Sequence, residues 1–369
     1  MNRTVVITGS SGLIGSALCA HLAPLYRVVG VDRRPPSAEL HQAASSVQWI
    51  VCDIAQRDPL LQNLQNTVPA SSIAPIVVHL AAHYHLGRRW SSAYTATNIH
   101  GTLNILAAAA CIKAARLIFA GSIAALIPPP GGGYLYERDP AGQAIAYTRS
   151  KAIAERFLQQ LAAYLPVAVI RLGGVFTDWC ELPPLYSLIR LWSRPRTLGR
   201  IMPGRGYAGF PYIHRHDAVA GIAHVIAHHE RLERYEVLFA APQGCTLQRD
   251  LFPLIHAQLH GGHQVRPLSI PAPLMWILLF AQKYFCRVRR RVALEQPWMA
   301  RYIDRPLVVD TSYTRQRLGW APHPSRSIVH CLPAILDRAL SAPNEYRQRN
   351  EQRILGHYQF RADESTIDD

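Results

Sequence analysis

A glycine-rich turn near the start of the chain constrains the fold more than any other feature of the sequence. The β-branched run Thr4–Thr8 is typical of a strand, and Gly9, Gly12 and Gly15 follow it directly. The first glycine permits a tight turn, the second lets backbone approach a pyrophosphate, and the third lets the next helix pack closely. The N-terminus of that helix would offer N–H groups and a partial positive charge to the phosphates.

The residues after this turn complete one strand–helix–strand unit. A helix is expected at residues 17–22, and a second apolar run at 28–31 ends on Asp32, about 20 residues beyond the turn. An acid at this place accepts hydrogen bonds from the adenosine ribose hydroxyls and repels a 2′-phosphate, which favours NAD as the cofactor. Arg33 and Arg34 leave NADP as an alternative, because a guanidinium group can bind that phosphate.

Further apolar runs alternate with helical stretches along the chain. The candidates for buried strands are residues 47–51, 76–80, 117–120, 167–171 and 237–240. The clearest helices between them are residues 98–115 and 144–164. This alternation predicts an α/β fold, a Rossmann-type doubly wound parallel sheet with helices on both faces.

The composition of the sequence changes after residue 171, where proline, glycine and tryptophan become frequent. We expect residues 1–175 to form the dinucleotide-binding domain, with the chain rejoining the sheet at about 212–241. Residues 176–211 and 242–340 would form a smaller, mostly helical C-terminal substrate lobe. The polar residues 341–369 are expected to be a loosely held tail.

Three residues are candidates for the catalytic group. Tyr147 and Lys151 lie four positions apart in an expected helix, so their side chains share one face. An adjacent ammonium group stabilises a phenolate and lowers the tyrosine pKa toward the working range of a base. Ser122 follows a strand at the carboxyl edge of the sheet, where it could hold the reacting oxygen.

Composition narrows the class of protein further. The 369 residues carry a formal net charge of +15, but outside residues 270–291 no basic block with interleaved aromatics indicates nucleic-acid binding. The seven cysteines are widely spaced and contain no C-x-x-C pair, which argues against a disulfide framework or a zinc site. Neither a signal peptide nor a membrane-spanning run is evident. We therefore expect a cytoplasmic protein that acts on a small molecule without a metal.

Several further segments form a family pattern with the glycine turn and the Tyr147/Lys151 pair. They are Cys52-Asp53-Ile54, His79-Leu-Ala-Ala82, Asn98-Ile-His-Gly-Thr102, Phe119-Ala-Gly-Ser122, Tyr212-Ile-His-Arg-His-Asp217 and Leu318-Gly-Trp-Ala-Pro322. Together they resemble the extended short-chain dehydrogenase/reductase family, which includes NAD-dependent epimerases and dehydratases and the 3β-hydroxysteroid dehydrogenases. The resemblance runs from about residue 5 to residue 340.

The resemblance implies which residues contact the cofactor and how the chain assembles. Asp53 looks like the family's adenine-contacting acid, and residues 80–82 like the segment that lines the nicotinamide ribose. The residues expected to bind the cofactor are Gly9, Ser11, Gly12, Leu13, Ile14, Gly15, Asp32, Arg33, Asp53, Ile54, Leu80, Ala81, Ala82, Asn98, Tyr147 and Lys151. The resemblance also implies a homodimer through the helices 98–115 and 144–164.

Departures from the family pattern bear on the substrate. Nucleotide-sugar members usually carry an Asn and an Arg that contact the diphosphate, at positions where this chain has Gly174 and Phe210. Their absence removes two contacts of about 1.5–3 kcal/mol each. His83, Gly174 and Phe210 are therefore the candidate substrate residues. Ile123-Ala124 stands where the 4,6-dehydratases place an Asp-Glu pair, so dehydration by that route is not expected.

Residues 270–291 form a second unusual segment. Residues 274–281 are apolar on every side of a helix, and arginines follow at positions 287 and 289–291. Such a helix either belongs to the core of the substrate lobe, with cations that complement its dipole, or lies in a lipid surface beside anionic headgroups. We expect a core helix, with peripheral membrane contact as the alternative.

These observations favour a NAD(P)-dependent oxidoreductase that transfers hydride reversibly on an alcohol or ketone of a mostly apolar, steroid-like or lipid-like substrate. The alternative is a NAD-dependent nucleotide-sugar epimerase, which uses the same three residues but retains its cofactor. A non-catalytic NAD-sensing protein is a third class, and the complete Ser–Tyr–Lys group argues against it.

Overall fold

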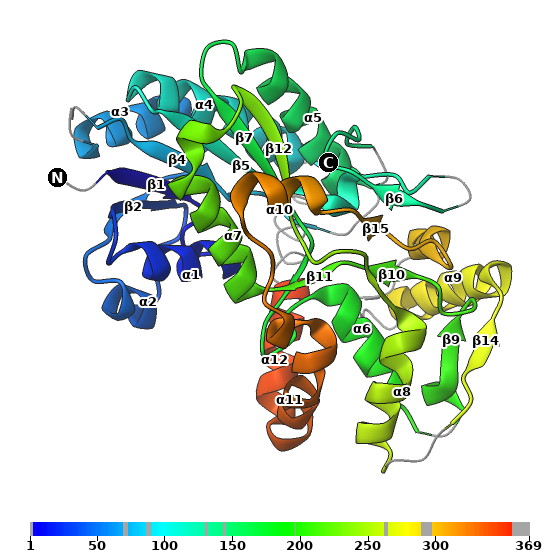
Figure 1. Cartoon of the computed structure of the whole chain (residues 1–369). Helices are drawn as coiled ribbons and strands as arrows, with labels where there is room; N and C mark the ends of the chain where they lie inside the picture. The colour runs from blue at the N-terminus through cyan, green and yellow to red at the C-terminus, as the bar shows by residue number, and fades with distance from the viewer. Residues whose placement is uncertain are drawn as a thin grey trace.

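The chain folds around a parallel sheet, seen in a computed structural model that describes residues 3–68, 73–85, 90–129, 132–142, 145–195, 197–261, 265–288 and 297–355. Within these residues seven strands pair in the order β12-β7-β5-β4-β1-β2-β3 (Figure 1). They are β1 (Thr4–Thr8), β2 (Arg27–Asp32), β3 (Gln48–Val51), β4 (Ile76–His79), β5 (Arg116–Ser122), β7 (Val167–Leu172) and β12 (Tyr235–Ala240). The Rossmann-type fold class is thereby confirmed. The strand order reverses between β1 and β4, and ligands bind at the carboxyl ends of the strands beside such a reversal.

Helices cover both faces of this sheet. They are α1 (Leu13–Leu22), α2 (Ala38–Ala43), α3 (Arg57–Thr67), α4 (Gly101–Cys111), α5 (Ala146–Leu161) and α7 (Arg215–Ala227). Because side chains alternate along a strand, Val5 and Ile7 of β1 join the core of α1 and α7, whereas Val6 joins the core of α3, α4 and α5. Burial on both faces explains why the central strands are uninterrupted apolar runs.

The helix expected at residues 98–115 has different bounds in the structure. It opens with a π-helical turn, η1 (Tyr94–His100), and continues as α4 to Cys111. Lys113 adopts a left-handed conformation with φ of 53°, which an α-helix cannot include, so the helix ends before it. π-Helical turns widen a helix locally and are frequent at functional sites.

The second lobe is mainly helical and lies below the sheet in Figure 1. Its helices are α6 (Pro183–Trp192), α8 (Gln248–Leu259), α9 (Ala272–Val288), α11 (Ile328–Ser341) and α12 (Pro343–Leu355), and α10 (Ser312–Leu318) packs back toward β12. Short strand pairs brace it: β6 (Tyr134–Leu135) with β15 (Val308–Val309), β8 (Gly174–Phe176) with β11 (Tyr212–His214), β9 (Ile201–Pro203) with β14 (Leu268–Ile270), and β10 (Gly209–Phe210) with β13 (Thr246–Leu247). Trp192, Leu251 and Leu332 lie at the centre of its core.

The prediction of a loosely held tail is wrong for residues 343–355, which form helix α12. Helix α12 packs against α11 and α6, with Tyr346 and Asn350 buried on one face four residues apart. The Asn350 amide accepts a hydrogen bond from the Glu181 N–H at 2.8 Å and donates one to the Trp179 carbonyl at 2.8 Å. These contacts tie the helix to the loop between β8 and α6. Residues 356–369 of the predicted tail lie outside the described residues.

The expectation of a core helix at 274–281 is also wrong. Only Met275 and Leu279 of that stretch are buried, whereas Ile277 is 62% exposed and Leu274 is 48% exposed. A lone helix at the edge of a lobe can bury only the stripe that faces its support, however apolar its other sides are. The arginines at 289–291 lie outside the described residues.

Candidate functional site

The glycine turn forms a close-packed junction between β1 and α1. Gly9 has a φ of +72°, and a Cβ there would lie 2.7 Å from the Ala81 nitrogen. A Cβ on Gly15 would lie 2.0 Å from the Gly9 carbonyl oxygen. No side chain larger than hydrogen fits at either place. The Gly12 N–H donates to the Gly9 carbonyl at 3.0 Å, and the N–H groups in the first turn of α1 have no partner within the helix and can bind a phosphate. This cradle fits the pyrophosphate of a dinucleotide.

Asp32 ends β2 beside this turn. Its carboxylate accepts a hydrogen bond from the Ser11 N–H at 3.0 Å and another from the Arg34 N–H at 3.1 Å. The Ser11 hydroxyl donates to the Arg34 carbonyl at 3.1 Å. The acid is thus fixed at the place where it would accept ribose hydroxyls, while the Arg33 side chain next to it is exposed. The geometry fits the NAD adenosine half.

The end of β3 supplies Asp53 and Ile54. The Asp53 carboxylate accepts the Ala55 N–H at 2.9 Å, which closes the turn after the strand. Ile54 is buried against Gly101, where a Cβ would lie 2.8 Å from the Ile54 Cδ1. Both residues therefore lie on the carboxyl edge, one strand beyond Asp32.

His79 is the last residue of β4, and the segment Leu80–Ala82 follows it directly. Its Nδ1 lies 2.7 Å from the Thr8 hydroxyl and its Nε2 lies 3.0 Å from the Thr102 hydroxyl. Complete burial, reinforced by the charge of Lys151, lowers the pKa of His79 to about 3. The imidazole is therefore neutral near pH 7. Through its two contacts it links β4 to β1 and to α4.

Asn98 connects the cofactor segment to the catalytic helix. Its amide oxygen accepts the His83 N–H at 2.6 Å, and its amide nitrogen donates to the His83 carbonyl at 3.0 Å and to the Ser150 hydroxyl at 2.7 Å. Ser150 in turn donates to the Tyr147 carbonyl at 2.7 Å. In this structure Asn98 positions His83 and α5, and its direct contact with the cofactor stays a prediction.

The three candidate catalytic residues come from β5 and α5. The Lys151 ammonium donates to the Ala120 carbonyl at 3.0 Å and lies 4.6 Å from the centre of the Phe119 ring. This contact brings α5 against the end of β5, two residues before Ser122. The Ser122 hydroxyl accepts the Ala124 N–H at 3.2 Å, and a hydroxyl that accepts one hydrogen bond still has a proton to donate.

The electrostatics of this group differ from the sequence expectation. Burial lowers the pKa of Lys151 to about 8, against a smaller opposing effect of Glu155. Burial also raises the pKa of Tyr147, and the nearby Tyr94 adds to the rise. The predicted lowering of the tyrosine pKa is therefore not present in this arrangement, in which the Lys151 ammonium binds the Ala120 carbonyl.

An aromatic cluster beside Tyr147 escaped the sequence analysis. The Tyr84 ring meets the Tyr147 ring edge-on at 4.8 Å, and the His83 ring meets Tyr94 edge-on at 4.9 Å. Trp90 lies 5.5 Å from Tyr94. The density of aromatic residues between positions 83 and 94 was the available signal. The cluster surrounds Tyr147, the candidate catalytic tyrosine, with aromatic side chains.

Gly174 and Phe210 lie together on the substrate side. A Cβ at Gly174 would lie 2.8 Å from the Phe210 Cδ1 and 3.1 Å from a methyl carbon of Leu182. The Phe210 ring thus fills the space that a longer side chain at 174 would need. At both positions where nucleotide-sugar members carry polar groups, this chain presents an apolar surface.

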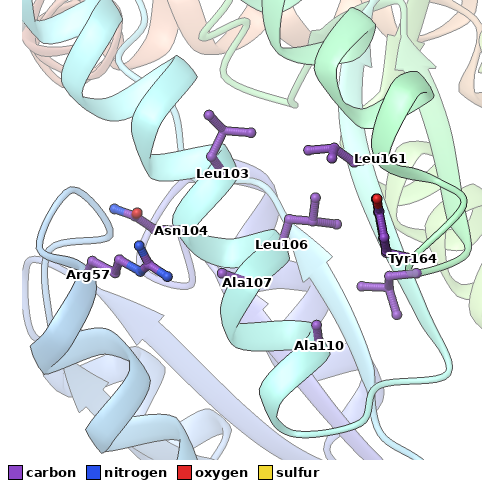
Figure 2. Close-up of a pocket in the computed structure, with 9 residues that line it drawn as sticks. Arg57, Leu103, Asn104, Leu106, Ala107, Ala110, Leu161 and Tyr164 are labelled. Atoms are coloured by element: carbon purple, nitrogen blue, oxygen red, sulfur yellow. The ribbon is translucent and has the colours of Figure 1, made fainter.

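A separate hollow of about 320 Å³ lies on the outer face of α4 and α5 (Figure 2). Leu106 and Ala110 of α4 line it with Leu161 and Tyr164 at the end of α5, and Arg57 stands at its rim. Tyr147 is 14 residues before Leu161, about 21 Å along the helix, so this hollow is not the catalytic site. Among the residues that the structure describes, no group of three or more His, Cys, Asp or Glu could hold a metal ion.

Curated relatives match parts of the chain. A putative dihydroflavonol 4-reductase of Synechocystis is 28% identical over 225 residues, which are 60% of this chain and 62% of the relative. A dTDP-glucose 4,6-dehydratase of Neisseria meningitidis is 32% identical over 119 residues, 29% of this chain and 31% of the relative. The matches thus span less than two thirds of either relative.

Solved structures match nearly the whole chain. A UDP-glucose 4-epimerase of Thermotoga maritima superposes with a TM-score of 0.68 at 18% identity, over 93% of this chain and all of the epimerase. A UDP-glucose 4-epimerase of Thermus thermophilus in complex with NAD superposes with a TM-score of 0.65 at 18% identity, over 92% of this chain and all of that one. At this identity the likeness shows the fold.

The family model described as NAD dependent epimerase/dehydratase matches residues 5–240, from the start of β1 to the end of β12. That range contains the glycine turn, Asp32, Ser122, Tyr147 and Lys151. The family's NAD dependence agrees with the cofactor predicted from the turn and from Asp32. The chain belongs to the NAD-dependent epimerase/dehydratase family.

Proposed function

We propose that this chain is a NAD-dependent dehydrogenase or reductase that interconverts an alcohol and its ketone on a mostly apolar substrate. The observation that carries the proposal is the apolar surroundings of the candidate residues. Tyr84 packs edge-on against Tyr147. Phe210 occupies the space beside Gly174 and packs against the cluster that contains Ile123, the residue after Ser122. A diphosphate needs charged or polar donors, and the side chains at positions 174 and 210 offer none.

The chain's own residues supply the proton chemistry. NAD held at the glycine turn and Asp32 would supply a hydride acceptor for oxidation of the alcohol, and NADH held there would supply a hydride donor for reduction of the ketone. Tyr147 takes the proton of the alcohol oxygen during oxidation and gives it back during reduction. Ser122 donates a hydrogen bond to that oxygen and orients it.

Lys151 supports this proton transfer through its charge. With a pKa of about 8, its side chain is mostly an ammonium group at pH 7. Movement of this ammonium from the Ala120 carbonyl toward Tyr147 would stabilise the phenolate and lower the tyrosine pKa.

A second candidate is a NAD-retaining nucleotide-sugar epimerase. The fold likeness to two UDP-glucose 4-epimerases favours it, because an epimerase would use the same three residues. It would return the hydride to the opposite face of the same substrate and would show no net consumption of NADH. The putative dihydroflavonol 4-reductase among the relatives favours the first candidate instead.

The test is to measure the turnover of a panel of apolar alcohols and ketones from the change in NADH absorbance. For any substrate that the wild type converts, Tyr147→Phe should lower kcat by about 10²–10⁴-fold, the usual contribution of general acid–base catalysis. Tyr164→Phe is the matched control, because that tyrosine is 81% exposed beyond the far end of α5. Turnover of Tyr147→Phe near the wild-type rate contradicts the proposed role.

A further inference from the structure

Helix α9 presents a broad apolar face that no described part of the chain covers. Its exposed large side chains are Leu274, Trp276, Ile277, Leu278, Phe280, Tyr284 and Phe285, each between 42% and 67% exposed. We propose that this face docks the protein on an anionic phospholipid surface. The inference does not depend on the proposed reaction.

The helix is held by one narrow stripe. Met275 and Leu279 pack against Ala300, Ile270 and Ile303, which belong to η5 (Pro297–Tyr302), to β14 and to the residue after η5. At 100° per residue the exposed side chains occupy the remaining arc of the helix, centred near Ile277. In Figure 1 α9 lies at the edge of the lobe, next to the pair β9–β14.

The size of this face is unusual for a surface. Single exposed apolar residues are ordinary on soluble proteins, but contiguous apolar patches of this kind mark sites of protein or membrane contact. Trp276 and Phe280 contact each other with ring centres 4.4 Å apart. Exposed Trp, Phe and Leu side chains on one side of a helix are the kind that enter a lipid interface, and the other side of α9 is already held by Met275 and Leu279.

Charge decides which partner fits. The sequence Ala272–Val288 contains no acidic residue, and its charged residues are Lys283 and Arg287. The segments packed against α9 add exposed arginines: Arg266 leads into β14, and Arg301 lies on η5. Basic groups around an apolar helix face complement the negative surface of anionic lipids, where each contributes about tenfold or less to binding.

Helix α9 has 17 residues, and no helix among the described residues is long and apolar enough to cross a bilayer. A second copy of the chain is a poorer partner, because both copies would bring the same positive charges to the contact.

The test is sedimentation of the full chain with phosphatidylcholine vesicles, with and without phosphatidylglycerol. We expect binding that rises when the anionic lipid is present and falls with added salt. Ile277→Ser combined with Phe280→Ser should lower the partition coefficient at least tenfold, because both side chains would otherwise enter the lipid. Lys283→Gln should weaken binding only to the anionic vesicles.

The matched control is Leu25→Ser combined with Leu340→Ser. These side chains are 61% and 57% exposed, but Leu25 follows α1 and Leu340 lies on α11. The control should bind vesicles as the wild type does. Circular dichroism and the thermal midpoint of each variant show whether it is folded.

Three results would overturn the proposal. One is a folded wild type that binds neither kind of vesicle. Another is an equal loss of binding in the control variant. The third is self-association of the wild type, measured by light scattering, that disappears in the Ile277→Ser and Phe280→Ser variant, which would assign the face to a second copy of the chain.

Discussion

His79 shows how one buried residue fixes the chemistry of its surroundings. The imidazole joins the hydroxyls of Thr8 and Thr102, one on the strand before the glycine turn and one on the helix that follows Asn98. Its neutrality is a consequence of burial, since a charged imidazole there would lack solvent and face the charge of Lys151.

This burial makes stability depend on pH. The folded-state pKa of His79 is lowered to about 3 from an ordinary 6.5, so the unfolded chain binds the proton first. Stability is therefore lost as pH falls below 6.5, until about pH 3. Between pH 7 and pH 5 the free energy of unfolding of the wild type should fall by about 2 kcal/mol more than that of His79→Gln. Urea unfolding at the two pH values measures this difference, and equal slopes for both proteins would contradict it.

Individual residues were predictable where a local pattern carries the chemistry. The spacing of Gly9, Gly12 and Gly15 and the four-residue interval from Tyr147 to Lys151 are such patterns. Tyr84 was not predictable, because its contact with Tyr147 joins a loop after β4 to a helix more than sixty positions later. The Lys151 contact with the Ala120 carbonyl depends on packing in the same way.

At the scale of elements, α12 stabilises a strained loop in the second lobe. Cys180 and Glu181 have left-handed φ angles of 73° and 48°, which cost free energy for residues other than glycine. The Asn350 side chain binds the Glu181 N–H and the Trp179 carbonyl. The helix thus holds the loop that leads into α6.

Asn350→Ala should lower the free energy of unfolding by about 1–3 kcal/mol, because it removes two hydrogen bonds to the loop. The Glu181 N–H and the Trp179 carbonyl then keep only their 3.1 Å bond to each other. The matched control is Asn344→Ala, an exposed position on the same helix, which should change stability by less than about 0.5 kcal/mol. Chemical denaturation gives both values. A loss for Asn350→Ala no larger than that of the control would show that α12 does not hold the loop.

Elements with a clear hydrophobic pattern were predicted correctly. Elements with few buried residues were not. The strands of the central sheet are uninterrupted apolar runs, so their positions were evident. Helix α12 buries only a few of its residues and resembles a polar tail. Helix α9 was expected in the core because hydrophobicity alone cannot tell burial in protein from exposure to a partner.

For the whole molecule, the carboxyl edge of the sheet gathers candidate cofactor-binding and catalytic residues from separate strands. The glycine turn, Asp32, Asp53, Leu80 and Ser122 each follow or end a different strand. Gly174 follows β7, and Phe210 packs beside it. The homodimer expected through α4 and α5 stays a prediction, and the hollow on that face (Figure 2) is where a partner copy would pack.

The proposed function requires NAD to enter and leave this site as a co-substrate of hydride transfer. The most direct test is to purify the protein without added cofactor, denature it, and measure the released nucleotide by mass spectrometry. We expect little retained nucleotide, in a protein that then binds NADH reversibly. Near-stoichiometric NAD in the purified protein would contradict the claim and identify a recycled cofactor, as the epimerase alternative requires.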